Sequence, residues 1–123
     1  MYCLDTSALI ELLRGSERGT RIKELLTGPA SVTAFSVHEL RGGARSGTTT
    51  VVDEFLEEFE IISYDAACAR ASAALEKALA KAGRSIGIID TLIAGTCVAK
   101  HATLVTVDND FKNVPELSVV VIS

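Results

Sequence analysis

The stretch that decides the fold is Ser85–Phe111, SIGIIDTLIAGTCVAKHATLVTVDNDF, which predicts a turn, a helix, a short strand and a second, acidic turn. Asp90 lies in the first turn of that helix, where free backbone N–H groups and the helix dipole favour a negative charge. A buried strand is predicted at Ala102–Val107, and Asp108 follows it directly. Because ligands bind at the carboxyl ends of strands in alternating α/β chains, the two acids can meet at one edge of a sheet. The predicted helix has one apolar face, made by Ile89, Leu92, Ile93, Thr96 and Cys97.

The rest of the chain alternates between predicted strands and helices in the same way. Further strands are expected at residues 1–4, 30–33, 60–63 and 117–122. Helices are expected at residues 8–13, 16–26, from 35 or 36 to 43, and 66–81, together with one whose apolar stripe is Val51, Val52, Phe55 and Phe59. Ser16 and Asp65 are the expected N-caps of two of them. Such alternation implies one α/β domain over residues 1–123, with a mainly parallel sheet and helices on both faces.

Composition narrows the possible partners of this chain. Twelve Lys and Arg residues stand against sixteen Asp and Glu, giving a net charge of −4. Proteins that coat nucleic acid are usually basic, so a polyanionic substrate would need a local basic rim or a bridging cation. Cys3, Cys68 and Cys97 are widely spaced without a C-x-x-C pair, which argues against a disulfide framework or zinc site and is typical of the cytoplasm. The opening MYCLD resembles no signal peptide and no apolar run approaches about 18 residues, so we expect no membrane association.

Four acidic residues stand where predicted elements begin or end, or lie within a helix. Asp5 ends the first strand, Glu39 lies in the helix after the second, and Asp90 and Asp108 flank the strand at Ala102–Val107 and its preceding helix. Taken singly, each has an ordinary structural role as a helix cap, a solvated surface group, a dipole partner or a turn residue. Taken together beside buried apolar segments, ionised carboxylates would repel and raise one another's pKa values. A divalent cation is the physical means of keeping them together.

The expected cation is Mg²⁺ or Mn²⁺, because the candidate ligands are all oxygen atoms and no His or Cys cluster accompanies them. Such a site can activate a water molecule and stabilise charge on a phosphodiester during in-line displacement. Three hydroxyl residues stand nearby in the sequence, namely Thr6, Ser7 and Thr106. They either orient metal-bound waters or the phosphate, or they serve as capping and strand-end hydroxyls.

Four segments, in this order, resemble the motifs of PIN domains. They are DTSALIELL at Asp5, TAFSVHELRGGA around Glu39, IGIIDTLIAGTCVAKHATLVT around Asp90 and TVDNDF at Asp108. Each motif is weak alone, but the resemblance spans essentially all 123 residues. Over that length the chain is similar to the small VapC-type toxins of VapBC toxin–antitoxin pairs.

The resemblance implies a metal-dependent endoribonuclease with a five-stranded parallel sheet. Its catalytic acids and metal ligands would correspond to Asp5, Glu39, Asp90 and Asp108. Asp110 is the alternative fourth acid; the T-x-D position favours Asp108 and leaves Asp110 an auxiliary role. The resemblance also implies a homodimer, and inhibition by a small VapB-type antitoxin whose tail lies in the acidic groove.

Arg14 follows the first predicted helix and Arg41 lies near Glu39, so both are candidates for contacts to RNA phosphates. Other functions compete with the toxin: a housekeeping RNA-processing nuclease of the same fold, a phosphoacceptor signalling domain, or an inactive partner-binding domain with an acidic metal pocket. A phosphoacceptor domain would need an Asp after the third strand and a Lys after the last. Asp65 meets the first requirement, but nothing basic follows Val121.

Overall fold

Five short parallel strands form one sheet in the order β3-β2-β1-β4-β5, in a computed structural model that describes residues 1–123. The strands are β1 (Tyr2–Leu4), β2 (Ser31–Thr33), β3 (Glu60–Ile62), β4 (Thr103–Thr106) and β5 (Ser118–Val121). The expected five-stranded parallel sheet is therefore confirmed. The central strand β1 pairs with β2 on one side and β4 on the other, so successive connections run in opposite directions from it. Such a reversal of strand order opens a crevice at the carboxyl ends of the strands.

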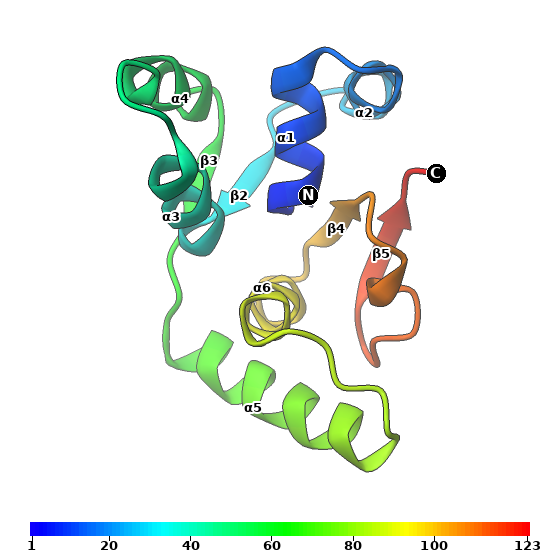
Figure 1. Ribbon diagram of the computed structural model, residues 1–123. Helices are drawn as coiled ribbons and strands as arrows, with labels where there is room; N and C mark the ends of the chain where they lie inside the picture. Colours follow the sequence, from blue (N-terminus) through cyan, green and yellow to red (C-terminus); the bar gives the residue numbers. More distant parts are fainter.

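Helices cover both faces of this sheet (Figure 1). One face carries α1 (Thr6–Arg14), α2 (Glu17–Leu25), α3 (Ala34–Gly43) and α4 (Thr49–Leu56). The other carries α5 (Ala66–Lys81) and α6 (Ile88–Ala99), and a single 3₁₀ turn, η1 (Asn109–Phe111), precedes β5. No helix combines the length and the apolar character needed to cross a membrane.

Side-chain caps fix where several helices begin. The side chains of Ser16 and Asp65 accept hydrogen bonds from the backbone N–H groups of Gly19 and Cys68, which confirms both expected N-caps. Asp5 caps α1 through the N–H of Ala8. A side-chain oxygen at this position satisfies one of the N–H groups that have no partner within the helix.

Alternation along the strands divides the core into two layers. Cys3 and Leu104 point toward α5 and α6, whereas Leu4 and Val105 point toward α1 to α4. Side chains on successive strand residues lie on opposite faces, so both surfaces of the sheet are apolar. All three cysteines are free and buried.

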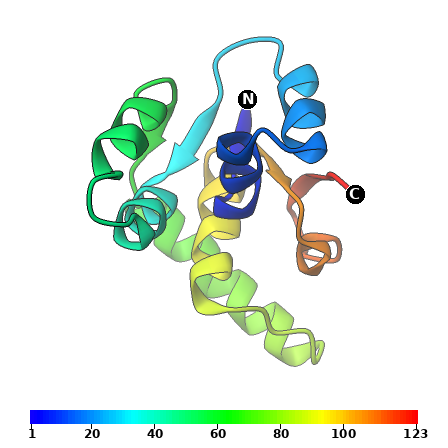
Figure 2. The same cartoon turned by 45° about the horizontal axis from the view of Figure 1, so that its top comes forward.

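Helix α6 is buried on more than the one face that its apolar spacing predicts. Thr91 and Gly95 are buried in addition to Ile93, Thr96 and Cys97, because α5 packs against the side of α6 that faces away from the sheet (Figure 2). A Cβ atom at Gly95 would lie 2.5 Å from the Cα of Ser72 on α5. The missing side chain of Gly95 allows this close approach.

The predicted apolar stripe of the fourth helix is partly wrong. Val52 and Leu56 are buried, but Val51 is 57% exposed. Phe59 lies beyond the end of α4, where its ring packs edge-on against Phe55 with 5.2 Å between centroids. The helix is therefore shorter than the spacing of its apolar residues indicated.

Candidate active site

Two of the predicted acids lie at the carboxyl ends of adjacent strands. Asp5 directly follows β1, and Asp108 lies two residues beyond β4. The strands pair in parallel, with Leu4 opposite Val105, so their carboxyl ends emerge side by side. This register explains why Asp5 and Asp108 lie at the same edge of the sheet, as the sequence predicts.

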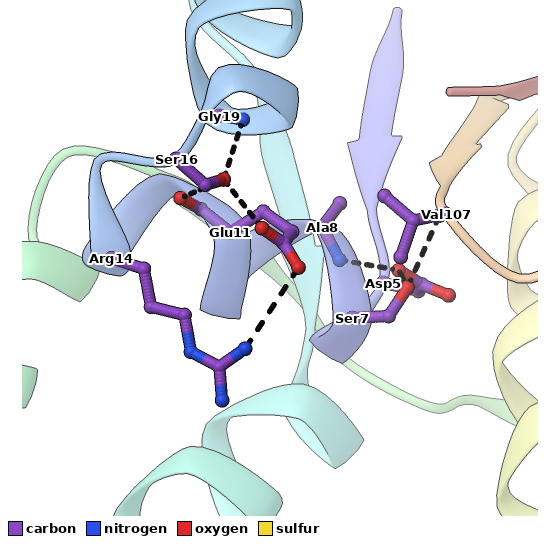
Figure 3. Close-up of polar contacts among 8 residues, drawn as sticks. All are labelled: Asp5, Ser7, Ala8, Glu11, Arg14, Ser16, Gly19 and Val107. Carbon is purple, nitrogen blue, oxygen red and sulfur yellow. Dashed lines mark hydrogen bonds and ion pairs between the residues drawn. The ribbon is translucent and has the colours of Figure 1, made fainter. Parts of the chain in front are cut away.

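Asp5 is fixed by its neighbours at the start of α1 (Figure 3). Its Oδ1 accepts hydrogen bonds from the N–H of Ala8 at 2.9 Å and the hydroxyl of Ser7 at 2.7 Å. The side chain is only 3% exposed. Burial raises the pKa of Asp5, while hydrogen bonds from Thr106, Ala8 and Ser7 oppose that rise. The carboxylate is thus held in one orientation at a site that disfavours its charge.

The hydroxyl of Thr106 connects Asp5 to Asp108. It donates a hydrogen bond to Oδ2 of Asp5 and accepts one from the backbone N–H of Asp108 at 3.0 Å. Ser7 lies 3.2 Å from the same hydroxyl and accepts a hydrogen bond from the N–H of Val107, which Figure 3 also shows. The predicted strand-end role of Thr106 is therefore present in the structure, whereas Ser7 caps no helix and instead links Asp5 to Val107.

Glu39 lies on α3, the helix that follows β2, and its side chain reaches the same edge of the sheet. The hydroxyl of Thr6 donates to Oε1 of Glu39 at 2.6 Å and lies 3.0 Å from the hydroxyl of Ser36. Sequence reasoning missed Ser36, which is fully buried. The only signal for it in the sequence is a hydroxyl residue one helical turn before Glu39.

Asp90 shows that the acids act on one another. Its pKa is raised to about 6, first by burial and then by the charges of Asp5, Asp108, Glu39 and Asp110. After burial, the largest contributions to this shift all come from carboxylates. All five predicted acidic residues, auxiliary Asp110 included, therefore form one electrostatically coupled cluster, although they come from four separate parts of the chain.

Asp110 is joined to Asp108 by the local turn. Its N–H donates to Oδ1 of Asp108 at 2.8 Å, which makes Asp108 the N-cap of η1. Asp110 is exposed, whereas Asp108 is partly buried next to β4. The position of Asp108 is thus the more enclosed of the two alternatives for the fourth acid.

The donor chemistry of this cluster suits a hard divalent cation. Its five side chains present only carboxylate oxygens, the ligands preferred by Mg²⁺ and Mn²⁺. No three Asp, Glu, His or Cys side chains are arranged so that they could hold a metal ion directly. Mg²⁺ commonly uses one or two carboxylates and keeps several waters, so the wider spacing of these acids fits that mode of binding.

The two arginines predicted to contact RNA are both engaged elsewhere. Arg41 pairs with Asp53 of α4, with Nε 2.9 Å from Oδ1 and Nη2 3.2 Å from Oδ2. Arg14 lies at the far end of α1 from Asp5, 4.0 Å from Glu11 (Figure 3). Neither arginine forms an ion pair with an acid of the cluster.

A large apolar cleft of about 770 Å³ adjoins Glu39. Its wall is formed by α3, by Tyr64 and by the start of α6. The lining residues are Ala34, Phe35, His38, Glu39, Gly42, Tyr64 and Ile89. Phe35 and Tyr64 meet edge-on within it, with 5.0 Å between ring centroids. The cluster is thus bordered on the Glu39 side by aromatic surface.

The chain is similar over most of its length to proteins named as nucleases. The chain is 30% identical over 116 residues to Ribonuclease VapC5 of Mycobacterium tuberculosis, covering 88% of this chain and 83% of that protein. It is 26% identical over 111 residues to the tRNA(fMet)-specific endonuclease VapC of Shigella flexneri, covering 85% and 84%.

A solved structure has the same fold over its whole length. The structure of VapBC2 from Rickettsia felis, bound to a DNA fragment from its promoter, matches with a TM-score of 0.85 and 28% identity. The match covers 99% of this chain and 98% of that one. The sequence model of the PIN domain matches residues 2–117, which include every acid of the cluster. On this sequence match, together with the shared sheet and helices, the chain belongs to the PIN domain family.

Proposed function

We propose that this protein is an endoribonuclease dependent on Mg²⁺ or Mn²⁺, and the toxin of a type II toxin–antitoxin pair. The observation that carries the proposal is the gathering of five carboxylates at one edge of the sheet, where Asp5, Glu39, Asp108 and Asp110 all act on the charge of Asp90. Such a cluster is costly for the fold, and a divalent ion would remove the cost. The similarity to relatives named as VapC ribonucleases supports RNA as the substrate.

Asp5, Glu39, Asp90 and Asp108 would hold the ion, directly or through water. When bound, the ion supplies positive charge to the reacting phosphate and lowers the pKa of a coordinated water. Thr106 keeps Asp5 and Asp108 in fixed relative positions, and Thr6 does the same for Glu39. The protein thus orients its carboxylates before substrate arrives, which is how preorganised charge lowers a reaction barrier.

The partners of the protein are part of the same proposal. The Rickettsia felis structure is a VapBC2 complex, which supports a small antitoxin as the partner of this chain. A basic or polar antitoxin segment would find its complement in the acidic cluster. The homodimer and the cytoplasmic location stay predictions, and size-exclusion chromatography with light scattering would measure the first.

The proposal is tested by incubating total cellular RNA with antitoxin-free protein. We expect discrete fragments with Mg²⁺ and none with EDTA. Asp90→Asn should lower the cleavage rate at least about 100-fold, because several kcal/mol of charge stabilisation at the reacting phosphate is lost.

Asp65→Asn is the matched control for this experiment. It makes the same chemical change at the start of a helix, but Asp65 is paired with Lys100 away from the cluster. Its cleavage should equal that of the wild type. Cleavage in EDTA would contradict the metal requirement, and full cleavage by Asp90→Asn would place the active site elsewhere.

A further inference from the structure

A second, polar cleft adjoins the acidic cluster at Asp110. It has a volume of about 420 Å³ and lies between the turn after α5 and η1. Its polar lining is formed by Arg84, Ser85, Asn109, Asp110 and Asn113. In contrast to the aromatic cleft beside Glu39, this one offers a guanidinium and two side-chain amides.

The polar cleft is continuous with the candidate active site. Asp110 lines it, donates its N–H to Asp108 and contributes to the raised pKa of Asp90. Ile86, which also lines it, lies just before the first turn of α6. A ligand lying in this cleft would therefore lie against Asp110, next to Asp108.

Arg84 is the only cationic residue in the lining of this cleft. Its guanidinium makes no ion pair and no hydrogen bond within the chain, unlike Arg14, Arg21 and Arg41. Arg84 lies in a hydrogen-bonded turn, because its backbone N–H donates to the carbonyl of Leu79 at 2.8 Å. Gly83, in the left-handed region at φ 69°, makes that turn.

An RNA strand approaching five carboxylates needs positive charge on the protein near the metal as well as at it. Arg84 is placed to provide this charge, because arginine binds phosphate oxygens through two parallel N–H groups. The amides of Asn109 and Asn113 can donate further hydrogen bonds to the same oxygens. The hydroxyl of Ser85 adds a fourth donor.

We propose that this cleft binds a backbone phosphate of the RNA next to the one that is cleaved, with Arg84 as its cation. The inference rests on the proposed ribonuclease function and names the residues that position its substrate. Arg84 is a positioning residue in this scheme, since it holds a phosphate that does not react. Its loss should therefore weaken substrate binding and leave the chemical step nearly unchanged.

The test measures cleavage of a short single-stranded RNA, taken from the fragments that the wild type produces, at several salt concentrations. Arg84→Gln should raise KM about tenfold, the scale of one charge-assisted contact, and change kcat less than about twofold. The slope of log KM against log salt should fall by about 0.7, as expected for one lost phosphate contact on a single strand. Arg84→Lys should recover part of the affinity.

Arg70→Gln on the exposed side of α5 is the matched control, because it removes the same charge outside the cleft. It should leave KM, kcat and salt slope unchanged. If Arg84→Gln behaves like Arg70→Gln while the wild type cleaves RNA, the phosphate site is wrong and the ribonuclease function stands. If the wild type cleaves no RNA with Mg²⁺, both fail. Thermal melts should show equal Tm for both variants, since the guanidinium of Arg84 makes no hydrogen bond and no ion pair within the chain.

Discussion

Two aspartates near opposite ends of helix α6, Asp90 within it and Asp65 beside its last residues, are in opposite electrostatic situations. At its start, Asp90 is surrounded by four other carboxylates, and its pKa is raised to about 6. At its end, Lys100 lies 2.5 Å from Asp65, the N-cap of α5, and this partner holds the pKa of Asp65 far below its usual range. Helix α6 is twelve residues long, so its two ends lie only about 18 Å apart.

This difference separates residues that stabilise the fold from residues that serve its chemistry. Asp65 has a cation and a backbone N–H as partners, and its charge is favourable where it stands. Asp90 has neither, and its ionised form is opposed by burial and by its neighbours. Active sites commonly retain such unfavourable groups at the expense of stability. The contrast can be tested through stability as well as through activity.

The largest expected change in stability comes from removing the charge of Asp90. Asp90→Asn should raise the free energy of unfolding of the metal-free protein at pH 7.5 by about 1 kcal/mol, after allowing for solvent screening. For a domain of this size the gain corresponds to roughly 4 °C in Tm. Calorimetry in EDTA measures it. A lower Tm would mean that ionised Asp90 stabilises the fold, as Asp65 does.

A smaller effect is expected from pH. The pKa of Asp90 is raised on folding from 3.8 to about 6, so the folded state binds more protons than the unfolded state between these values. Stability from this group therefore increases as pH falls through about 6 and is lost as pH rises above it. Lowering the pH from 7.5 to 5.5 should raise the Tm of the wild type by roughly 2 °C relative to Asp90→Asn. Parallel pH profiles of the two proteins would exclude Asp90 as the titrating group.

The smallest effect is expected at the opposite end of the helix. Asp65→Asn removes an exposed ion pair but keeps a side-chain oxygen that can cap α5, so Tm should fall by no more than about 1 °C. The pKa of Asp65 is lowered on folding, so its contribution is present above about pH 4 and is lost as the pH falls below this value. Thermal melts at pH 7.5 and pH 3 measure the difference. A rise in Tm at pH 7.5 would show that the pair with Lys100 is unfavourable.

Local chemistry made much of the fold predictable. Ser16 and Asp65 were identifiable as N-caps because each precedes a helical pattern with a side-chain oxygen at the right position. Asp5 and Asp108 could be placed at strand ends because Asp5 directly follows β1 and Asp108 lies two residues beyond β4. Their meeting then follows from parallel pairing, which the alternation of strands and helices predicts.

What could not be predicted depends on contacts between distant segments. The burial of α6 on several sides requires α5 to lie against Gly95, and spacing within α6 contains no information about that neighbour. Arg41 near Glu39 in sequence is drawn away by Asp53 in the next helix. Nothing in the sequence marked Arg84 as a candidate site residue, because it comes to lie beside Asp110 only when the turn after α5 packs near η1.

The hydrogen bond from Thr106 to Asp5 joins residues 101 positions apart in the chain. Contacts of such long range form late in folding, because closing a long loop must precede them. Any opening that detaches β4 from β1 separates Asp5 from Asp108 and dismantles the candidate site at once. A partly folded or nascent chain that lacks this pairing would therefore have no assembled active site, which delays any activity until the sheet is complete.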